Sequence, residues 1–237
     1  MFNKLGYEVI DISQISDILV RLRKYSFDVF DHFSNEYAGK EIRSDEDLID
    51  FRINDQKYQW LALKHLQFSQ PLFELGGASI FSELLKSKFC MKRPNLELPP
   101  YMRCDIPVED QSLFKQHQDY AFNLGSSNSL AIWIPLQDTS ISEGALMCSE
   151  GSHLNGVYKN LNGIIDEKIR FEFKSVPVKF GEALVFDQKL VHKSGMNLSD
   201  VVRFSVILRF SDLCDREYLS RKCPINHEIT TIEYANS

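Results

Sequence analysis

Apolar residues in the first third of the chain recur at the spacing of helices. One helical face carries a row of isoleucines and leucines: Ile12, Ile15, Ile18, Leu19 and Leu22. A second apolar stripe runs from Trp60 to Leu66, and a third runs from Ser79 to Phe89, just before the turn signal Lys92-Arg93-Pro94. Because residues three and four positions apart share one side of a helix, residues 1–93 are predicted to be mainly helical.

The pattern changes after Pro94, where short apolar runs replace the helical stripes. The strand-like runs cover residues 130–136, 144–148, 178–180, 183–186 and 203–210, and turn signals rich in Gly, Asn and Ser separate them. Short strands after a helical start predict a mainly β sandwich or barrel with flanking helices. We expect a single domain over residues 1–237, with a helical part at about 1–93, a β core at about 94–212 and a C-terminal tail at 213–237. Pro135 lies inside an apolar run, which predicts a bulge or an edge position.

Charge and cysteine content exclude several classes of protein. With 27 basic and 33 acidic residues the net charge is −6, so the chain lacks the basic surface of a nucleic-acid-binding protein. The five cysteines are widely spaced and form no CxxC pair, which favours a reducing compartment over a disulfide framework. The N-terminus has no long apolar core of a signal peptide, and the run from Leu130 to Leu136 is too short to span a bilayer. We therefore expect a soluble cytoplasmic protein without a membrane partner.

The sequence His117-Gln118-Asp119 places two potential metal ligands two residues apart. On a strand, residues i and i+2 point to the same face, so an imidazole and a carboxylate can converge on one ion. His192, 75 residues downstream, is the best candidate for a third ligand. Two histidines and one carboxylate leave positions open on the metal, as Fe(II) oxygenases require for a bidentate cosubstrate and O₂. The alternative is that these are ordinary surface or packing residues, because an HxD pattern alone is a weak signal.

Arg203 lies eleven residues after His192, inside an otherwise apolar strand-like run. A guanidinium in that setting suits the distal carboxylate of 2-oxoglutarate, which needs a permanently charged partner with two hydrogen-bond donors. Ser205 shares the strand face of Arg203 and is expected to donate a second hydrogen bond. The alternative role for Arg203 is a surface ion pair, for example with Asp200.

An ordered series of short motifs extends from about Tyr101 to Phe210. The chain reads QHQDY at 116–120, IWIPL at 132–136, EGAL at 143–146, EGSH at 150–153, FGEALVFD at 180–187, VHKS at 191–194, NLSD at 197–200 and RFS at 203–205. This series resembles the phytanoyl-CoA dioxygenase family of Fe(II)- and 2-oxoglutarate-dependent oxygenases. The resemblance implies a double-stranded β-helix, or jelly-roll, with the metal inside its mouth.

The resemblance also implies roles for individual residues. His117, Asp119 and His192 match the iron ligands, and Arg203 matches the residue that pairs with the distal carboxylate of the cosubstrate. Further positions that match the cosubstrate pocket or face the site are Ser194, Trp133 and Arg103. The implied cofactor is Fe(II), with 2-oxoglutarate and O₂ as cosubstrates and ascorbate as a reductant.

Two departures from the family pattern concern the substrate subgroup rather than the iron. Lys115 stands where many relatives have an aromatic residue, and Cys148-Ser149-Glu150 replaces the usual apolar-Pro lead into Gly-Ser-His. Related halogenases lack the carboxylate ligand, so the presence of Asp119 favours hydroxylation. We expect hydroxylation of a small polar metabolite or biosynthetic intermediate, with release of succinate and CO₂.

The sequence is also compatible with other functions. The same iron could catalyse desaturation, epimerisation or cyclisation, because the pose of the substrate decides the outcome. A non-catalytic jelly-roll binding protein and a cupin-like zinc or manganese enzyme are further alternatives. Substrate contacts are expected from Tyr120, Asn123, Arg103 and the N-terminal helices, in a monomer or homodimer.

Overall fold

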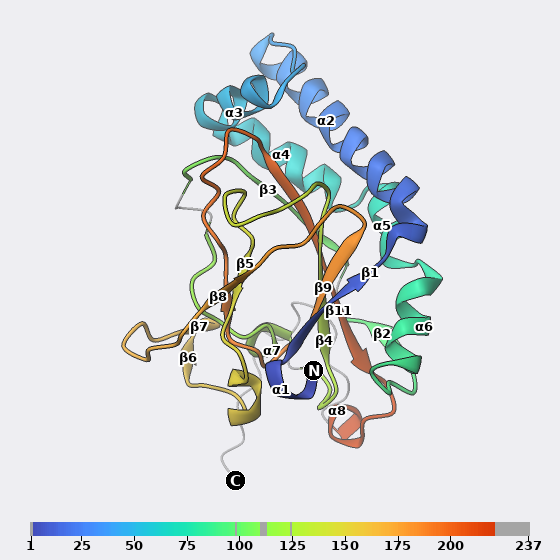
Figure 1. Ribbon diagram of the computed structural model, residues 1–237. Coiled ribbons are helices and arrows are strands. Elements are labelled where there is room, and N and C mark those ends of the chain that lie inside the picture. The colour runs from blue at the N-terminus through green and yellow to red at the C-terminus, as the bar shows by residue number, and fades with distance from the viewer. Residues whose placement is uncertain (1, 98, 110–112, 124, 221–237) are drawn as a thin grey trace.

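A large antiparallel sheet forms the centre of the molecule (Figure 1). The computed structural model describes residues 2–97, 99–109, 113–123 and 125–220. The strands follow the order β1–β9–β4–β11–β2, and β3 also pairs with β11. The strands of this sheet are β1 (Tyr7–Asp11), β9 (Glu182–Asp187), β4 (Leu130–Pro135), β11 (Arg203–Asp212), β2 (Pro94–Leu96) and β3 (Tyr101–Asp105).

A smaller sheet lies across from the large one and closes the barrel. Its order is β10–β5–β8, with bounds His192–Lys193, Leu146–Cys148 and Lys174–Val176. His117 extends this sheet through an antiparallel bridge to His192. The short hairpin of β6 (Asn160–Leu161) and β7 (Ile164–Ile165) lies beside it. Two facing antiparallel sheets joined in this order form a double-stranded β-helix, which confirms the predicted fold class.

Helices cover the outer face of the large sheet (Figure 1). They are α2 (Ser16–Ala38), α3 (Asp45–Asn54), α4 (Gln56–Leu66), α5 (Gln70–Gly76) and α6 (Ser79–Ser87), with α1 (Phe2–Leu5), α7 (Tyr120–Asn123) and α8 (Arg216–Ser220) elsewhere; the 3-10 turns are η1 (Ser13–Ile15) and η2 (Ser152–Asn155). Helix α2 buries Leu19, Leu22 and Phe30 completely, because these residues recur on one side of the helix. It ends where Gly39 adopts φ +66° and its N–H bonds to Asn35 O, a left-handed cap that glycine forms without steric cost.

The two faces of β11 have different surroundings, and this difference positions the site. Its even-numbered residues, including Phe204 and Leu208, belong to the large apolar cluster beneath the helices. Ile207 packs in a separate cluster inside the barrel, with Trp133 and Cys148. Since side chains alternate along a strand, the other odd-numbered residues of β11 also face the barrel interior. Arg203, Ser205 and Arg209 are therefore carried on the inner face.

The structure adds one strand that the pattern did not predict and corrects one expectation. Residues 7–11 form strand β1, which pairs with β9 at the edge of the large sheet and precedes the helices α2 to α6. Pro135 lies at the last residue of the central strand β4 rather than at a bulge or on an edge strand. It is tolerated there because pairing with β9 extends only from Leu130 to Trp133, so no neighbour on that side requires its missing N–H.

Strand β2 begins at Pro94 and β11 ends at Asp212, at the limits that the sequence analysis gives the β core. The division of the domain into three parts itself stays a prediction. Most of the C-terminal tail, residues 221–237, lies outside the described residues. Among those described, no helix has both the length and the apolar character needed to cross a bilayer.

Candidate metal and cosubstrate site

Three side chains from two segments of the chain meet inside the barrel. His117 and His192 exchange two backbone hydrogen bonds, each with N···O of 3.0 Å, so their side chains lie side by side with ring centroids 4.1 Å apart. Asp119 Oδ1 lies 3.6 Å from His117 Nε2 and 3.9 Å from His192 Nε2. The potential ligand atoms of the three residues all lie within 4.8 Å of one another, and all three residues are buried. The structure therefore brings the predicted ligand set together.

Both imidazoles are fixed with Nε2 toward the centre of this set. His117 Nδ1 lies 2.7 Å from Lys115 O, and His192 Nδ1 lies 3.0 Å from Leu190 O. A carbonyl oxygen only accepts, so each Nδ1 carries the proton and donates. Each Nε2 is then left with its lone pair, which is the form that binds a metal ion.

Gln118, between the two ligands, anchors the segment from the opposite side. Its amide nitrogen donates to Gly156 O at 2.8 Å and to Lys189 O, and its amide oxygen accepts from Tyr158 N at 2.8 Å. The side chain is only 1% exposed. Because neighbouring side chains on an extended segment point in opposite directions, fixing Gln118 also fixes the direction of His117 and Asp119.

Asp119 forms two hydrogen bonds with an arginine that the sequence analysis did not single out. Arg209 Nε donates to Asp119 Oδ2 at 2.9 Å, and a terminal nitrogen of Arg209 donates to Oδ1 at 3.1 Å. Burial alone would raise the pKa of Asp119, but the Arg209 guanidinium and the two imidazoles outweigh it and hold that pKa well below its usual range. Burial, together with the neighbouring His117, lowers the pKa of His192 to about 3. The set is thus a carboxylate beside a neutral imidazole at neutral pH, as metal binding requires.

Arg203 lies on the same inner face of β11, in a second polar cluster. It is 3% exposed, and one terminal nitrogen lies 2.9 Å from Asp105 Oδ2. Its other terminal nitrogen donates to backbone oxygens, among them Gly144 O. A Cβ on Gly144 would lie 2.6 Å from this guanidinium, and Gly144 has φ +79°, so only glycine fits. Arg203 is therefore buried with Asp105 rather than paired with Asp200 at the surface.

Two donors of this second cluster have no hydrogen-bond partner among the described residues. They are Arg203 Nε and Ser205 Oγ, and both residues are nearly inaccessible, at 3% and 1%. Buried donors without partners are costly, and these two residues share one face of β11 inside the barrel, so together they suit a ligand that accepts hydrogen bonds. A carboxylate accepts two, so the residues present fit the distal end of 2-oxoglutarate.

Asp105 holds two guanidiniums at once, since Arg103 also pairs with it, with Nε 3.2 Å from Oδ2. Burial alone would raise the pKa of Asp105, but Arg103 and Arg203 lower it to about 2. Two guanidiniums beside the carboxylate of Asp105 place cationic hydrogen-bond donors at this end of the barrel, which suits an anionic ligand.

The other predicted residues lie near these clusters with different roles. Ser194 exchanges hydrogen bonds with Phe114, because its hydroxyl accepts from Phe114 N at 3.2 Å and its N–H donates to Phe114 O at 3.0 Å. Trp133 packs in the inner apolar cluster and is 4% exposed. Tyr120 donates its backbone N–H to Gln188 O, and its ring lies 5.0 Å from Lys189 Nζ. Asn123 ends helix α7, and its side chain lies outside the described part.

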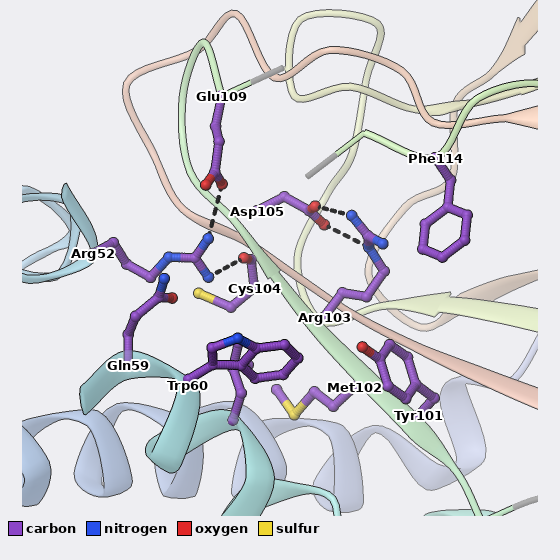
Figure 2. Close-up of a pocket in the computed structure, with 11 residues that line it drawn as sticks. Arg52, Gln59, Trp60, Tyr101, Met102, Arg103, Cys104, Asp105, Glu109 and Phe114 are labelled. Carbon is purple, nitrogen blue, oxygen red and sulfur yellow. Dashed lines mark hydrogen bonds and ion pairs between the residues drawn. The ribbon is translucent and has the colours of Figure 1, made fainter. Parts of the chain in front are cut away.

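A groove of about 340 Å³ crosses the edge strand β3 (Figure 2). On one side Arg103 stacks on the Phe114 ring at 5.3 Å, close to Tyr101 (Figure 2). On the other side lies Trp60 of α4, which is 59% exposed. The Phe114 ring also lies 5.2 Å from the His117 ring. The groove therefore runs up to a side chain that contacts one of the candidate metal ligands.

Sequence reasoning missed Arg209, Asp105 and Phe114. Arg209 could have been found, because it lies at an even spacing from Arg203 and so shares its strand face. Asp105 follows Arg103 on a short strand and resembles a surface charge in the sequence. Phe114 lies in a segment with no apolar periodicity, so no local signal indicates its position beside His117.

Comparison with known proteins gives matches at three levels. The model of the family described as "Phytanoyl-CoA dioxygenase (PhyH)" matches residues 24–205. The chain is 29% identical over 141 residues to "Phytanoyl-CoA dioxygenase 1" of Oryza sativa subsp. japonica, which covers 49% of this chain and 50% of that protein. The chain thus spans about half the length of this curated relative.

Two solved structures share the fold at low sequence identity. One is the epimerase SnoN in complex with Fe³⁺, alpha-ketoglutarate and nogalamycin RO, with TM-score 0.62 and 15% identity over 89% of this chain and 80% of that chain. The other is EctD from S. alaskensis in its apo form, with TM-score 0.62 and 18% identity over 91% and 76%. The family match extends over well more than half of the sequence and includes both predicted ligand segments. This chain is a member of the phytanoyl-CoA dioxygenase family.

Proposed function

We propose that this protein is a non-haem Fe(II)- and 2-oxoglutarate-dependent oxygenase that oxidises a small molecule. The observation that carries the proposal is the pairing of two clusters on one barrel interior. His117, Asp119 and His192 form a ligand set for a cation, and Arg203 and Ser205 present unpartnered buried donors for a carboxylate. A structural role alone leaves the second cluster unexplained, since unsatisfied buried donors destabilise a fold.

The residues divide the work between metal and cosubstrate. His117 and His192 would bind Fe(II) through Nε2, and Asp119 would bind it through Oδ1, the oxygen nearer the imidazoles. Arg203 Nε and Ser205 Oγ would receive the distal carboxylate of 2-oxoglutarate. When bound, iron and cosubstrate supply oxidative decarboxylation of 2-oxoglutarate by O₂, with release of succinate and CO₂. The burial of all five side chains excludes bulk water from the reacting centre.

The groove across β3 supports a place for the substrate beside this centre. Its lining includes Tyr101, Arg103 and Phe114, and the two aromatic rings are 41% and 42% exposed. Part-exposed rings beside a guanidinium suit a molecule with both an apolar face and a polar or anionic group. This agrees with the expected small metabolite or biosynthetic intermediate.

Hydroxylation is the outcome that we propose first, because Asp119 occupies the carboxylate position that related halogenases lack. The solved SnoN structure with the same fold is described as an epimerase, so epimerisation is the second candidate. Analysis of products by mass distinguishes them, since hydroxylation adds one oxygen atom and epimerisation leaves the mass unchanged. Ascorbate as reductant, the oligomeric state and the cytoplasmic location stay predictions.

The proposal is tested by a metabolite screen that measures succinate formed from 2-oxoglutarate. We expect a true substrate to stimulate succinate formation in the wild-type protein loaded with Fe(II), and His117→Ala to abolish it. Gln116→Ala is a matched control in the same segment, because Gln116 Nε2 donates to backbone oxygens of the loop at 166–169 and away from the ligand set. Full-rate succinate formation by His117→Ala would contradict the proposal.

A further inference from the structure

Arg209 is the one described cation that hydrogen-bonds to a candidate metal ligand. It approaches Asp119 side-on, with Nε 2.9 Å from Oδ2 and a terminal nitrogen 3.1 Å from Oδ1. Two parallel N–H···O bonds fix the plane of a carboxylate as well as its position. The carboxylate is only 1% exposed, and the arginine side chain is 18% exposed. The pair is therefore well shielded from competing water.

The arginine itself is held in place by its strand. Arg209 pairs across the sheet with Ala131, whose small side chain leaves room for the long arginine to extend over the inner face. Its backbone oxygen accepts from Glu97 N at 2.9 Å. On the other face of β11, Leu208 and Phe210 are buried beneath the helices. Because β11 is held on both faces, the backbone position from which the Arg209 side chain extends is fixed.

A second buried acidic side chain, Glu97, lies near enough to Arg209 to interact with its charge. Glu97 is 4% exposed, and its carboxylate is held by Gln188 Nε2 at 2.9 Å and by Ser211 Oγ. Of the two acidic side chains, Asp119 is the one that accepts hydrogen bonds from Arg209 and lies beside the imidazoles.

The two oxygens of Asp119 have different surroundings. Both accept from Arg209, Oδ2 from Nε at 2.9 Å and Oδ1 from a terminal nitrogen at 3.1 Å. Oδ1 is also the oxygen nearer the imidazoles, at 3.6 Å and 3.9 Å from their Nε2 atoms. A free carboxylate can rotate and present either oxygen or both to a cation. With both oxygens fixed in one plane by Arg209, Asp119 presents Oδ1 rather than Oδ2 to an ion beside the imidazoles. Binding through one oxygen leaves more positions on the ion for other ligands.

We propose that Arg209 is a positioning residue that holds Asp119 for single-oxygen binding of the catalytic metal ion. The inference rests on the proposed function, because it takes Asp119 as a metal ligand. Arg209 acts through Asp119 and need not touch the substrate. The role depends on the fork shape of the guanidinium rather than on its charge alone, since a lysine ammonium cannot form two parallel hydrogen bonds with one carboxylate.

The test compares metal binding by the wild-type protein and the variants Arg209→Lys and Arg209→Met. Mn(II) and Co(II) are titrated without cosubstrate, and the visible spectrum of the Co(II) form reports the coordination of the ion. We expect Mn(II) affinity to fall roughly 10- to 100-fold in Arg209→Met, the usual effect of removing a residue that orients a ligand. Arg209→Lys should lose about tenfold or more, and the Co(II) spectrum should change in both variants.

A matched control separates positioning from general destabilisation. Arg52→Met removes another buried guanidinium, which pairs with Glu109 and the Cys104 carbonyl but contacts none of the three ligands. We expect this variant to unfold at lower temperature and to bind Mn(II) as the wild type does. If Arg209→Met does not fold, Arg209→Lys still decides the question, because it keeps the charge.

Two outcomes would overturn the inference. Mn(II) affinity within about twofold of wild type in Arg209→Lys, with an unchanged Co(II) spectrum, would show that the fork geometry is not needed, and the proposed function would stand. Absence of Mn(II) and Co(II) binding by the wild-type protein would overturn the positioning role and the proposed function together.

Discussion

Arg203 and Arg209 stand on the same inner face of one strand, and each pairs with a buried carboxylate, yet the two ends of the strand suit opposite ligands. At the Arg203 end, Asp105 is shared with Arg103, so two guanidiniums meet one carboxylate. At the Arg209 end, Asp119 meets a single guanidinium and two imidazoles. The first arrangement leaves the Arg203 Nε and Ser205 Oγ donors without partners among the described residues, and the second leaves lone pairs that suit a metal ion.

The comparison teaches that an arginine–aspartate pair does not define a site by itself. What decides the ligand is the set of groups that the pair leaves unsatisfied. Near Arg203 these groups are N–H and O–H donors, which bind an anion. Near Arg209 they are Nε2 atoms and a carboxylate oxygen, which bind a cation. One strand therefore carries residues of a candidate cation site and a candidate anion site in the same barrel, as the proposed iron enzyme with a dicarboxylate cosubstrate requires.

The largest expected effect comes from removing the carboxylate at the cation end. Asp119→Ala should abolish metal-dependent succinate formation and Mn(II) binding, because the ion loses a charged ligand and Arg209 is left without its partner. Calorimetric titration with Mn(II) measures the loss. Asp105→Asn is the comparison variant at the other end of the strand, and it should bind Mn(II) as the wild type does. Equal Mn(II) affinities for Asp119→Ala and wild type would contradict the assignment of the two ends.

Removing the guanidinium at the anion end should affect the cosubstrate and leave the metal in place. Arg203→Met should weaken 2-oxoglutarate binding about 100-fold, because a hydrogen bond to a charged group contributes about 1.5–3 kcal/mol. Titration of the Mn(II)-loaded protein with 2-oxoglutarate measures the change. Mn(II) affinity itself should stay within about twofold of wild type. If Arg203→Met loses Mn(II) binding but keeps its affinity for 2-oxoglutarate, the proposed roles of the two ends of the strand are wrong.

The amount that could be predicted from the sequence follows from how local each signal is. The spacing of His117 and Asp119 places both on one face of an extended segment, and the spacing of Arg203 and Ser205 does the same. The same alternation extends to Arg209, so its place on the inner face of the strand could also have been predicted. Strand β1 could not have been predicted in this way, because its five residues pair with β9, far along the chain. Local periodicity does not report a distant partner.

The role of Asp105 also depends on distant contacts. Its partner Arg203 lies on a strand about 100 residues away, and the sequence around Asp105 gives no sign that it is buried. Residue-level matching to a family named the candidate ligands, and the strand pairing then showed the electrostatic environment of each of them. Long-range strand register therefore carries the information that the sequence analysis lacked.

The pH dependence of stability sharpens the comparison at the Asp105 end. The folded-state pKa of Asp105 is about 2, below the ordinary value of 3.8, so the unfolded chain binds more protons between these pH values and stability rises with pH across them. The difference corresponds to about 2 kcal/mol of unfolding free energy, which is fully present above about pH 4 and is lost as pH falls toward 2. Asp105→Asn should lack this increment. Urea unfolding at a series of pH values measures it, and parallel curves for the two proteins would refute the role of the pair.

The smallest expected effect is at Ser205. Ser205→Ala removes one donor to the proposed carboxylate, so 2-oxoglutarate binding should weaken about tenfold, since one hydrogen bond to a charged group contributes about 1.5 kcal/mol. The melting temperature of Ser205→Ala should stay unchanged or rise slightly, because Ser205 Oγ has no partner among the described residues. Titration of the Mn(II)-loaded variant with 2-oxoglutarate and a thermal melt test both statements. Unchanged affinity would remove Ser205 from the cosubstrate site.

The most direct measurement of the central claim is an anaerobic titration of the Fe(II)-loaded protein with 2-oxoglutarate, followed by visible absorption. Chelation of the cosubstrate to iron in the barrel predicts a weak charge-transfer band that saturates at one equivalent and is absent in Asp119→Ala. A protein that binds Fe(II) but shows no such band at saturating 2-oxoglutarate would contradict the account.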